Sequence, residues 1–104
     1  MGGILMNTTI QSVHFTASEQ LELFVNQKTG KLVQFFDGII SAEVILKLEK
    51  SETTDNKVSE ISIKIPGETL FAKKQAKTFE EATDLACDAL RKQLVKVKEK
   101  GSTK

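Results

Sequence analysis

The alternation of apolar and polar positions along the chain predicts four strands. In Ile39–Glu49 every second residue is apolar, which is the pattern of a strand with one buried and one wet face. Shorter alternations, or segments rich in Thr, Ile, Val and Phe, predict three further strands over Asn7–Phe15, Lys57–Ile65 and Leu70–Lys77. Turns or polar loops are predicted between these strands, at Asp37-Gly38, Lys50–Asn56 and Pro66-Gly67.

Two other segments carry the period of amphipathic helices. The first is predicted to begin at a Thr-x-x-Glu capping box formed by Thr16 and Glu19 and to end near Gln34. Its inward side consists of Ala17, Leu21, Phe24, Val25, Leu32 and Phe36. The second is longer and begins at a similar box formed by Thr78 and Glu81. Its apolar stripe consists of Phe79, Ala82, Ala86, Ala89, Leu90, Leu94 and Val97.

The order of the elements, β-α-β-β-β-α, predicts an α+β two-layer sandwich. A helix between the first two strands implies that they pair in parallel through a right-handed crossover, and the other strands follow as an antiparallel meander. Both helices are expected to pack on one face of this four-stranded mixed sheet. We expect one domain over residues 7–100 and a polar tail over 101–104. Residues 1–6, with two glycines and a second methionine, are predicted to be a leader or a vector-derived remnant.

Composition argues against catalysis, and we expect the protein not to be an enzyme. The 104 residues contain one cysteine and one histidine, so an intrachain disulfide, a cysteine-based zinc cluster and a histidine triad are out of reach. Cys87 borders the stripe of the last helix and is predicted to be a packing residue, and His14 is expected to have a structural role in an extended segment. There is no Trp or Tyr and no apolar run long enough to cross a bilayer. We therefore expect a soluble cytoplasmic protein with no catalytic residue, metal, cofactor, membrane contact or small-molecule substrate.

Charge is unevenly distributed along the chain. The formal net charge is +1, but residues 78–90 carry −4 and residues 91–104 carry +5. Acids at the start of a helix and bases at its end suit the helix dipole, which accounts for part of this pattern. On a helical wheel, however, Lys92, Lys96 and Lys100 follow one flank, whereas Arg91 and Lys98 follow the other. The basic residues therefore lie on both sides of the buried stripe.

Further basic residues are predicted to converge on the same region. Lys28 and Lys31 end the first helix, and Lys73 and Lys74 lie on the last strand. We expect lysines from both helices to line one groove, with the last strand adding more at its margin. Such a surface engages phosphates as point charges and suits structured RNA. The candidate RNA-binding residues are Lys28, Lys31, Lys73, Lys74, Arg91, Lys92, Lys96, Lys98 and Lys100.

Several segments in this order resemble the short ribosome hibernation-promoting factors and ribosome-associated inhibitor A proteins, also called the sigma-54 modulation family. The resemblance covers about residues 8–100. It is carried by Phe24-Val25, Lys31–Asp37, Val44–Lys50, Ala82–Asp88 and the closing run Leu90–Lys100. Many members have an Asp-Met-Tyr-like entry to the last helix, where this chain has Thr78-Phe79-Glu80, so contacts of that acidic and aromatic pair are not carried over.

The resemblance implies a fold similar to double-stranded RNA-binding domains. It also implies binding of rRNA in the channel of the small ribosomal subunit where mRNA and tRNAs sit, which blocks translation in stationary or stressed bacterial cells. The short form implies no C-terminal dimerisation domain, and we expect a monomer off the ribosome. The alternative is a regulatory protein-interaction module that uses its acidic surface or an open sheet edge, as the family's sigma-factor name suggests.

Overall fold

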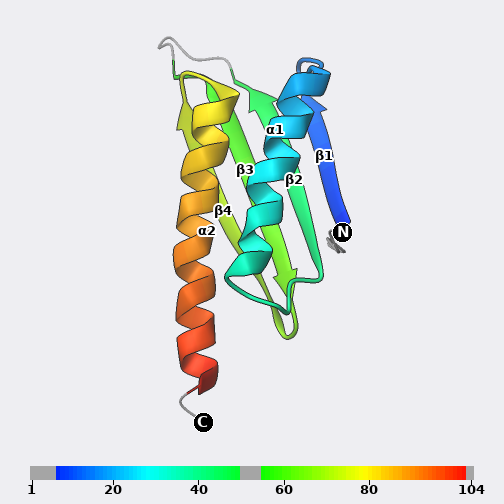
Figure 1. The fold of residues 1–104 in the computed structure, drawn as a ribbon. Helices are drawn as coiled ribbons and strands as arrows, with labels where there is room; N and C mark the ends of the chain where they lie inside the picture. The colour runs from blue at the N-terminus through cyan, green and yellow to red at the C-terminus, as the bar shows by residue number, and fades with distance from the viewer. Residues whose placement is uncertain (1–6, 50–54, 103–104) are drawn as a thin grey trace.

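The computed structural model describes residues 7–49 and 55–102, with the side chains of 101 and 102 left out. The elements follow the predicted order (Figure 1). They are β1 (Asn7–Val13), α1 (Glu19–Gly30), the 3-10 helix η1 (Lys31–Gln34), β2 (Ser41–Leu48), β3 (Lys57–Ile65), β4 (Glu68–Ala76) and α2 (Phe79–Ser102). The predicted leader, the middle of the hairpin loop and the last two residues lie outside the described residues.

The four strands form one mixed sheet in the order β1-β2-β3-β4. β1 pairs with β2 in parallel, and the remaining neighbours are antiparallel. Both helices cover the same face of the sheet and run in the same direction (Figure 1). The predicted α+β two-layer sandwich is therefore confirmed. Because the two helices are parallel, their acidic first turns lie at one end of the molecule and their basic last turns at the other.

The core lies between the sheet and the helices. β2 and β3 supply fully buried Val44, Leu46, Ile61 and Ile63, while the helices add Val25, Leu90 and Leu94. Burying one such side chain contributes roughly 1.5–3 kcal/mol, so these positions hold the two layers together. One polar pair lies within this core, where the Thr83 hydroxyl of α2 donates to the Ser59 hydroxyl of β3 at 3.2 Å.

The first helix differs from the prediction at both ends. The predicted cap, Thr16, is wrong. The N-cap is Ser18, whose hydroxyl accepts a hydrogen bond from the Leu21 amide at 3.1 Å. The buried face of the helix consists of Leu21, Val25 and Thr29, which lie one turn apart. At the other end, the last four residues to Gln34 form η1, a tighter 3-10 turn that keeps Leu32 buried.

Strand ends also differ from the prediction. β1 ends at Val13, and His14 has φ +70, so the prediction that it lies in an extended segment is wrong. The left-handed backbone turns the chain off the sheet toward α1, and His14 Nδ1 lies 3.4 Å from the Leu48 carbonyl oxygen. β2 begins only at Ser41, leaving Ile40 48% exposed.

The β3–β4 hairpin is tighter than predicted, so β4 begins two residues early. Ile65 pairs with Glu68, which leaves Pro66 and Gly67 as a two-residue loop. Gly67 has φ +90, a conformation that glycine adopts without a Cβ penalty.

The last helix begins as predicted and continues further than predicted. The Glu81 amide donates to the Thr78 hydroxyl at 3.0 Å, which is the capping contact the sequence indicates. The helix runs on to Ser102, so the first two residues of the predicted polar tail are helical. Its last turns extend past the end of the sheet (Figure 1). No helix in the described part of the chain is both long and apolar enough to cross a membrane.

Candidate nucleic-acid interface

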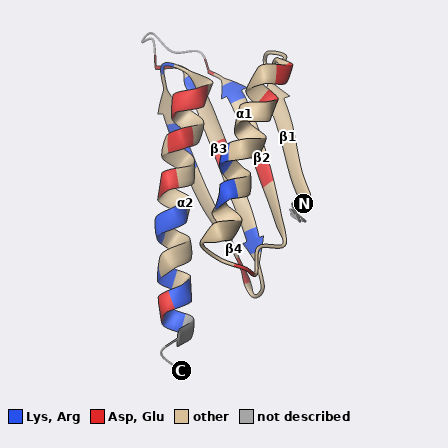
Figure 2. Ribbon diagram, in the orientation of Figure 1, with Lys and Arg blue, Asp and Glu red and all other residues tan. Residues whose placement is uncertain are grey.

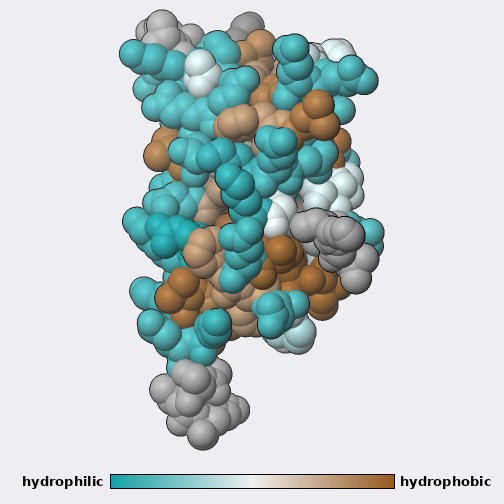
Figure 3. Space-filling model, viewed as in Figure 1, coloured by the Kyte–Doolittle hydropathy of each residue, from teal (hydrophilic) through white to brown (hydrophobic). Residues whose placement is uncertain are grey.

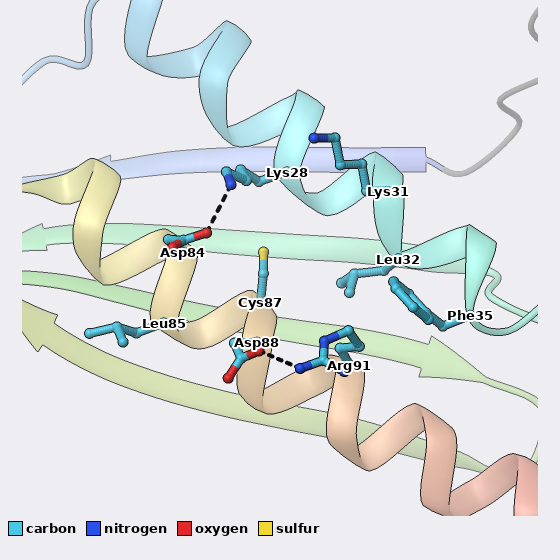
Figure 4. Close-up of a pocket in the computed structure, with 9 residues that line it drawn as sticks. All are labelled: Lys28, Lys31, Leu32, Phe35, Asp84, Leu85, Cys87, Asp88 and Arg91. Atoms are coloured by element: carbon cyan, nitrogen blue, oxygen red, sulfur yellow. Dashed lines mark hydrogen bonds and ion pairs between the residues drawn. The ribbon is translucent and has the colours of Figure 1, made fainter.

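An open groove of about 290 Å3 lies between the two helices (Figure 4). Buried Leu32 and Cys87 lie toward its base, and charged side chains surround them. Its lining residues are Lys28, Lys31, Leu32, Phe35, Asp84, Leu85, Cys87, Asp88 and Arg91. Of the predicted RNA-binding residues, Lys28, Lys31 and Arg91 are thus brought to one groove.

The groove is not purely basic, because two aspartates of α2 also line it. Lys28 Nζ lies 2.8 Å from Asp84 Oδ1, and this hydrogen bond raises the pKa of Lys28. Arg91 Nη2 lies 2.6 Å from Asp88 Oδ1, and this hydrogen bond lowers the pKa of the Asp88 carboxyl. Both pairs are drawn in Figure 4. The lining residues therefore include three bases and two acids, and most of the charge is paired.

Aromatic rings hold two of these bases against the helices. The Lys28 ammonium lies 5.6 Å from the centroid of the Phe24 ring, and the Arg91 guanidinium lies 5.8 Å from that of Phe35. A cation over a ring face is attracted to its quadrupole, so the rings restrict where the basic groups can point.

Cys87 is a packing residue at the border of the buried stripe, as the sequence predicts. It is a free cysteine, and burial raises the pKa of its thiol to about 12. The thiol therefore stays protonated at neutral pH, which is opposite to the requirement for a nucleophile. Within the described ranges, no group of three or more His, Cys, Asp or Glu residues is placed to hold a metal ion.

The second half of α2 carries most of the exposed basic residues. Lys92, Lys96, Lys98 and Lys100 are all exposed, and Arg91 is half-buried. Figure 2 shows acidic residues over the first half of the helix and basic residues over the second half. Among the described residues, Lys96 and Lys98 make no ion pair, whereas Lys92 lies 3.4 Å from Asp88 Oδ2. The helix-bearing face as a whole is mostly hydrophilic, with apolar side chains visible between the polar ones (Figure 3).

The two flanks of this helix face different neighbours. Arg91 faces α1 across the groove, and Lys98, seven residues further on, continues that flank. On the opposite side, the Gln93 amide donates to the Phe71 carbonyl of β4 at 3.0 Å. Lys96 and Lys100 follow on that side, and Lys92 lies on the outer surface of the helix. The expectation that lysines of both helices line one groove therefore holds for α1, but of the basic residues of α2 only Arg91 lines it.

The two lysines of β4 point to opposite faces of the sheet. Ala72 is buried under the helices, so Lys73 points to the open face, where Glu60 Oε2 lies 3.8 Å from Lys73 Nζ and 3.1 Å from Lys47 Nζ. Lys74 is on the helix-bearing side, in register with Ser59, and is exposed. The expectation that Lys73 lies at the margin of the groove is therefore wrong, because a one-residue step along a strand changes the face.

Sequence reasoning missed four groove residues, Phe35, Asp84, Leu85 and Asp88. The spacing of Asp88 to Arg91 and Lys92, at i+3 and i+4, is a signal for ion pairs within a helix. The Lys28–Asp84 pair joins residues 56 positions apart, so no local pattern indicates it.

The fold and this surface define a small α+β domain with one strongly basic helix end. The chain belongs to the sigma 54 modulation protein / S30EA ribosomal protein family, whose sequence model matches residues 8–102. The description of this family names a sigma 54 modulation protein and a ribosomal protein.

Two relatives that match this chain over most of their length have the same name, ribosome hibernation promoting factor. The chain is 35% identical over 95 residues to the ribosome hibernation promoting factor of Escherichia coli K12, which covers 91% of this chain and 94% of the relative. It is 33% identical over 95 residues to the protein of the same name from Pseudomonas putida KT2440, covering 91% and 89%.

Solved structures share the fold. The N-terminal domain of Thermus thermophilus Protein Y matches with a TM-score of 0.76 at 22% identity, over 88% of this chain and 99% of that one. A ribosomal subunit interface protein from Coxiella burnetii also matches with a TM-score of 0.76 at 22% identity, over 90% and 99%.

Proposed function

We propose that this protein is a cytoplasmic, non-enzymatic translation inhibitor that associates with the ribosome and keeps idle ribosomes inactive. It binds the small subunit in the channel for mRNA and tRNA, with the basic end of α2 and the α1–α2 groove against rRNA. The observation that carries the proposal is the cluster of exposed lysines on the second half of α2, in a chain of the S30EA family.

The chemistry of this surface favours phosphates over bases. Lysine ammonium groups are compact charges that neutralise phosphates without reading base edges. Lys96 and Lys98 are exposed and have no acidic partner in the described ranges. Lys31 at the start of η1 adds another such charge on the groove side. A surface of this kind recognises RNA by shape and backbone.

The position of these residues suits a narrow binding site. The last turns of α2 extend past the sheet (Figure 2), and the lysines of its second half, Lys92, Lys96, Lys98 and Lys100, are exposed. A helix that protrudes in this way enters a space between two RNA surfaces more easily than the flat face of a sheet does. This supports a channel rather than an open rRNA surface as the binding place.

A second candidate is a regulatory module that binds another protein. The observation in its favour is β4, which is an edge strand with Phe71 exposed on the open sheet face. Such an edge can accept an additional strand. Gln93 already occupies the Phe71 carbonyl at this edge, which weakens the second candidate.

Co-sedimentation with isolated small subunits and with whole ribosomes tests the proposal, with the salt concentration varied between about 50 and about 200 mM. We expect one bound copy per small subunit at low salt, a steep loss of binding as salt rises, and inhibition of cell-free translation at the same protein concentration. Counterion release from RNA produces that steepness, whereas an apolar protein interface responds weakly to salt. Absence of binding to small subunits at low salt contradicts the proposal.

A further inference from the structure

Carboxylates of α2 already contact the bases in and beside the α1–α2 groove. Asp84 Oδ1 lies 2.8 Å from Lys28 Nζ, and Asp88 Oδ1 lies 2.6 Å from Arg91 Nη2. The second oxygen, Asp88 Oδ2, lies 3.4 Å from Lys92 Nζ. Asp88 thus holds two cations with its two oxygens, as a phosphate group of RNA does when it accepts from two basic side chains.

We propose that Asp84 and Asp88 determine RNA specificity, because in the free protein they occupy the contacts that phosphates make with Lys28, Arg91 and Lys92. They thereby lower the affinity of the protein for polyanions other than its ribosomal target. This inference rests on the proposed function, since it concerns which RNA the same surface accepts.

The helix dipole does not account for these two acids. The dipole acts within the first turn of a helix, where Glu80 and Glu81 lie. Asp84 and Asp88 lie in the second and third turns, on the flank that faces α1. Stability does not account for them either, because the Asp84 and Asp88 side chains are 61% and 48% exposed and exposed ion pairs contribute little.

The same exposure makes the pairs easy to exchange. A weak, solvent-screened pair opens without a change in the backbone, and all the basic side chains involved have several rotatable bonds. When a phosphate takes the place of Asp84 or Asp88, the basic side chain gains a contact with the phosphate but loses its contact with the carboxylate. Each displaced carboxylate stays nearby and repels the incoming phosphate. An RNA that reaches only the groove therefore gains little net attraction.

Other bases carry no such competitor. Lys31, Lys96 and Lys98 make no ion pair within the part of the chain that the structure describes. Lys31 lies at the end of α1, and the other two lie on the last turns of α2. RNA binds strongly only if its backbone engages both of these places together, which an arbitrary duplex or single strand does less well than a surface shaped for the protein.

The variant Asp84→Asn/Asp88→Asn tests this inference on the full chain. Its binding is measured against isolated small subunits and against an RNA duplex of arbitrary sequence of about 20 base pairs, each over a salt series. We expect the duplex to bind more tightly and the slope of log K against log salt to become steeper by about 2. With a slope steeper by about 2, the duplex affinity of the variant falls roughly sixteen-fold more than that of the unaltered protein over a fourfold rise in salt. Binding to small subunits is expected to increase less, so the preference for the ribosome falls.

Two controls distinguish the loss of the aspartate–base contacts from the rise in net positive charge that the variant also brings. Glu80→Gln/Glu81→Gln removes two acids of the same helix that make no ion pair among the described residues, and it is expected to change duplex binding less than the aspartate variant does. Adding Lys28→Gln to Asp84→Asn removes the base that Asp84 holds, and it is expected to cancel the gain of the single variant. Thermal unfolding of each variant checks that the fold is intact.

The outcomes distinguish this inference from the proposed function. If the unaltered protein shows no salt-dependent binding to small subunits, the proposed function fails. If it does bind, but the aspartate and glutamate variants gain duplex affinity equally, or neither gains any, the role assigned to Asp84 and Asp88 is wrong while the proposed function stands.

Discussion

The two halves of α2 share one helix but differ in what they contact. The first half, Phe79–Leu90, packs on the sheet through Ala82, Thr83, Ala86 and Leu90, all fully buried. Among the second-half side chains that the structure describes, Leu94 alone is fully buried, and Val97 is partly buried against the core. The first half is acidic and the second basic (Figure 2). Burial and positive charge are therefore separated along the helix.

Because of this separation, we expect that the fold and the proposed binding surface can be altered independently. Side chains in the first half, together with Leu94, hold the layers together, so their loss costs stability. Exposed side chains in the second half contribute little to stability.

The largest effect on stability is expected in the first half. Leu90→Ala removes a side chain that is fully buried between the helix and the sheet, and we expect a loss of about 2–5 kcal/mol in the free energy of unfolding. Val97→Ala in the second half serves as the comparison and is expected to lose about 1 kcal/mol, because that side chain is smaller and only partly buried. Denaturant unfolding of both variants measures the difference, and equal losses would contradict the separation.

The largest effect on binding is expected in the second half. Lys92→Glu/Lys96→Glu/Lys100→Glu leaves the buried stripe untouched, so we expect the fold to stay intact, with only a small loss of stability from the Asp88–Lys92 pair and the helix dipole. Ribosome binding should fall at least about a hundredfold at low salt, since three phosphate contacts are replaced by repulsion. Co-sedimentation measures the loss. The triple variant binding like the unaltered protein would sink the assignment of this surface.

A smaller effect is expected at the polar pair inside the first half. Thr83→Val removes the donor to the Ser59 hydroxyl and leaves a buried polar group unsatisfied, which we expect to cost about 1–3 kcal/mol. The combined variant Ser59→Ala/Thr83→Val removes both partners and should recover most of that loss. If the combined variant is less stable than Thr83→Val alone, the pair contributes through packing instead.

The smallest effect concerns Cys87. Burial raises the pKa of its thiol from 9.0 to about 12, so alkylation of the folded protein at pH 8 should be slow and should follow the fraction unfolded. Because the folded pKa is above the unfolded one, the stability linked to this group is present below pH 9 and is lost as the pH rises from 9 toward 12. Cys87→Ala should weaken that decline. Rapid alkylation under native conditions would contradict the packing role.

The sequence predicts the layers of this fold well because the signals are periodic. The limits of β3, the parallel pairing of β1 with β2 and the cap at Thr78 follow from alternation, element order and a local motif. The start of α1 differs from the prediction because Thr16 and Ser18 both carry a hydroxyl that can cap a helix, and in the structure it is the Ser18 hydroxyl that accepts from the Leu21 amide.

The composition of the candidate site was harder to predict. The basic end of α2 is visible as a run of residues, but the face to which Lys73 points depends on the register of β4. The pairing of Lys28 with Asp84 depends on how closely α1 and α2 pack, which no local pattern encodes. Contacts between elements that are far apart in the sequence, such as α1 and α2, become visible only in the folded structure.

Site-directed crosslinking to the ribosome tests most directly whether the second half of α2 contacts RNA. A single cysteine is introduced by Lys96→Cys or by Glu80→Cys, each in the Cys87→Ala background, and is attached to a photoactivated crosslinker. We predict crosslinks to rRNA of the small subunit from position 96 and few or none from position 80. Equal crosslinking from both positions, or crosslinks from position 80 alone, would contradict the account of a binding half and a packing half.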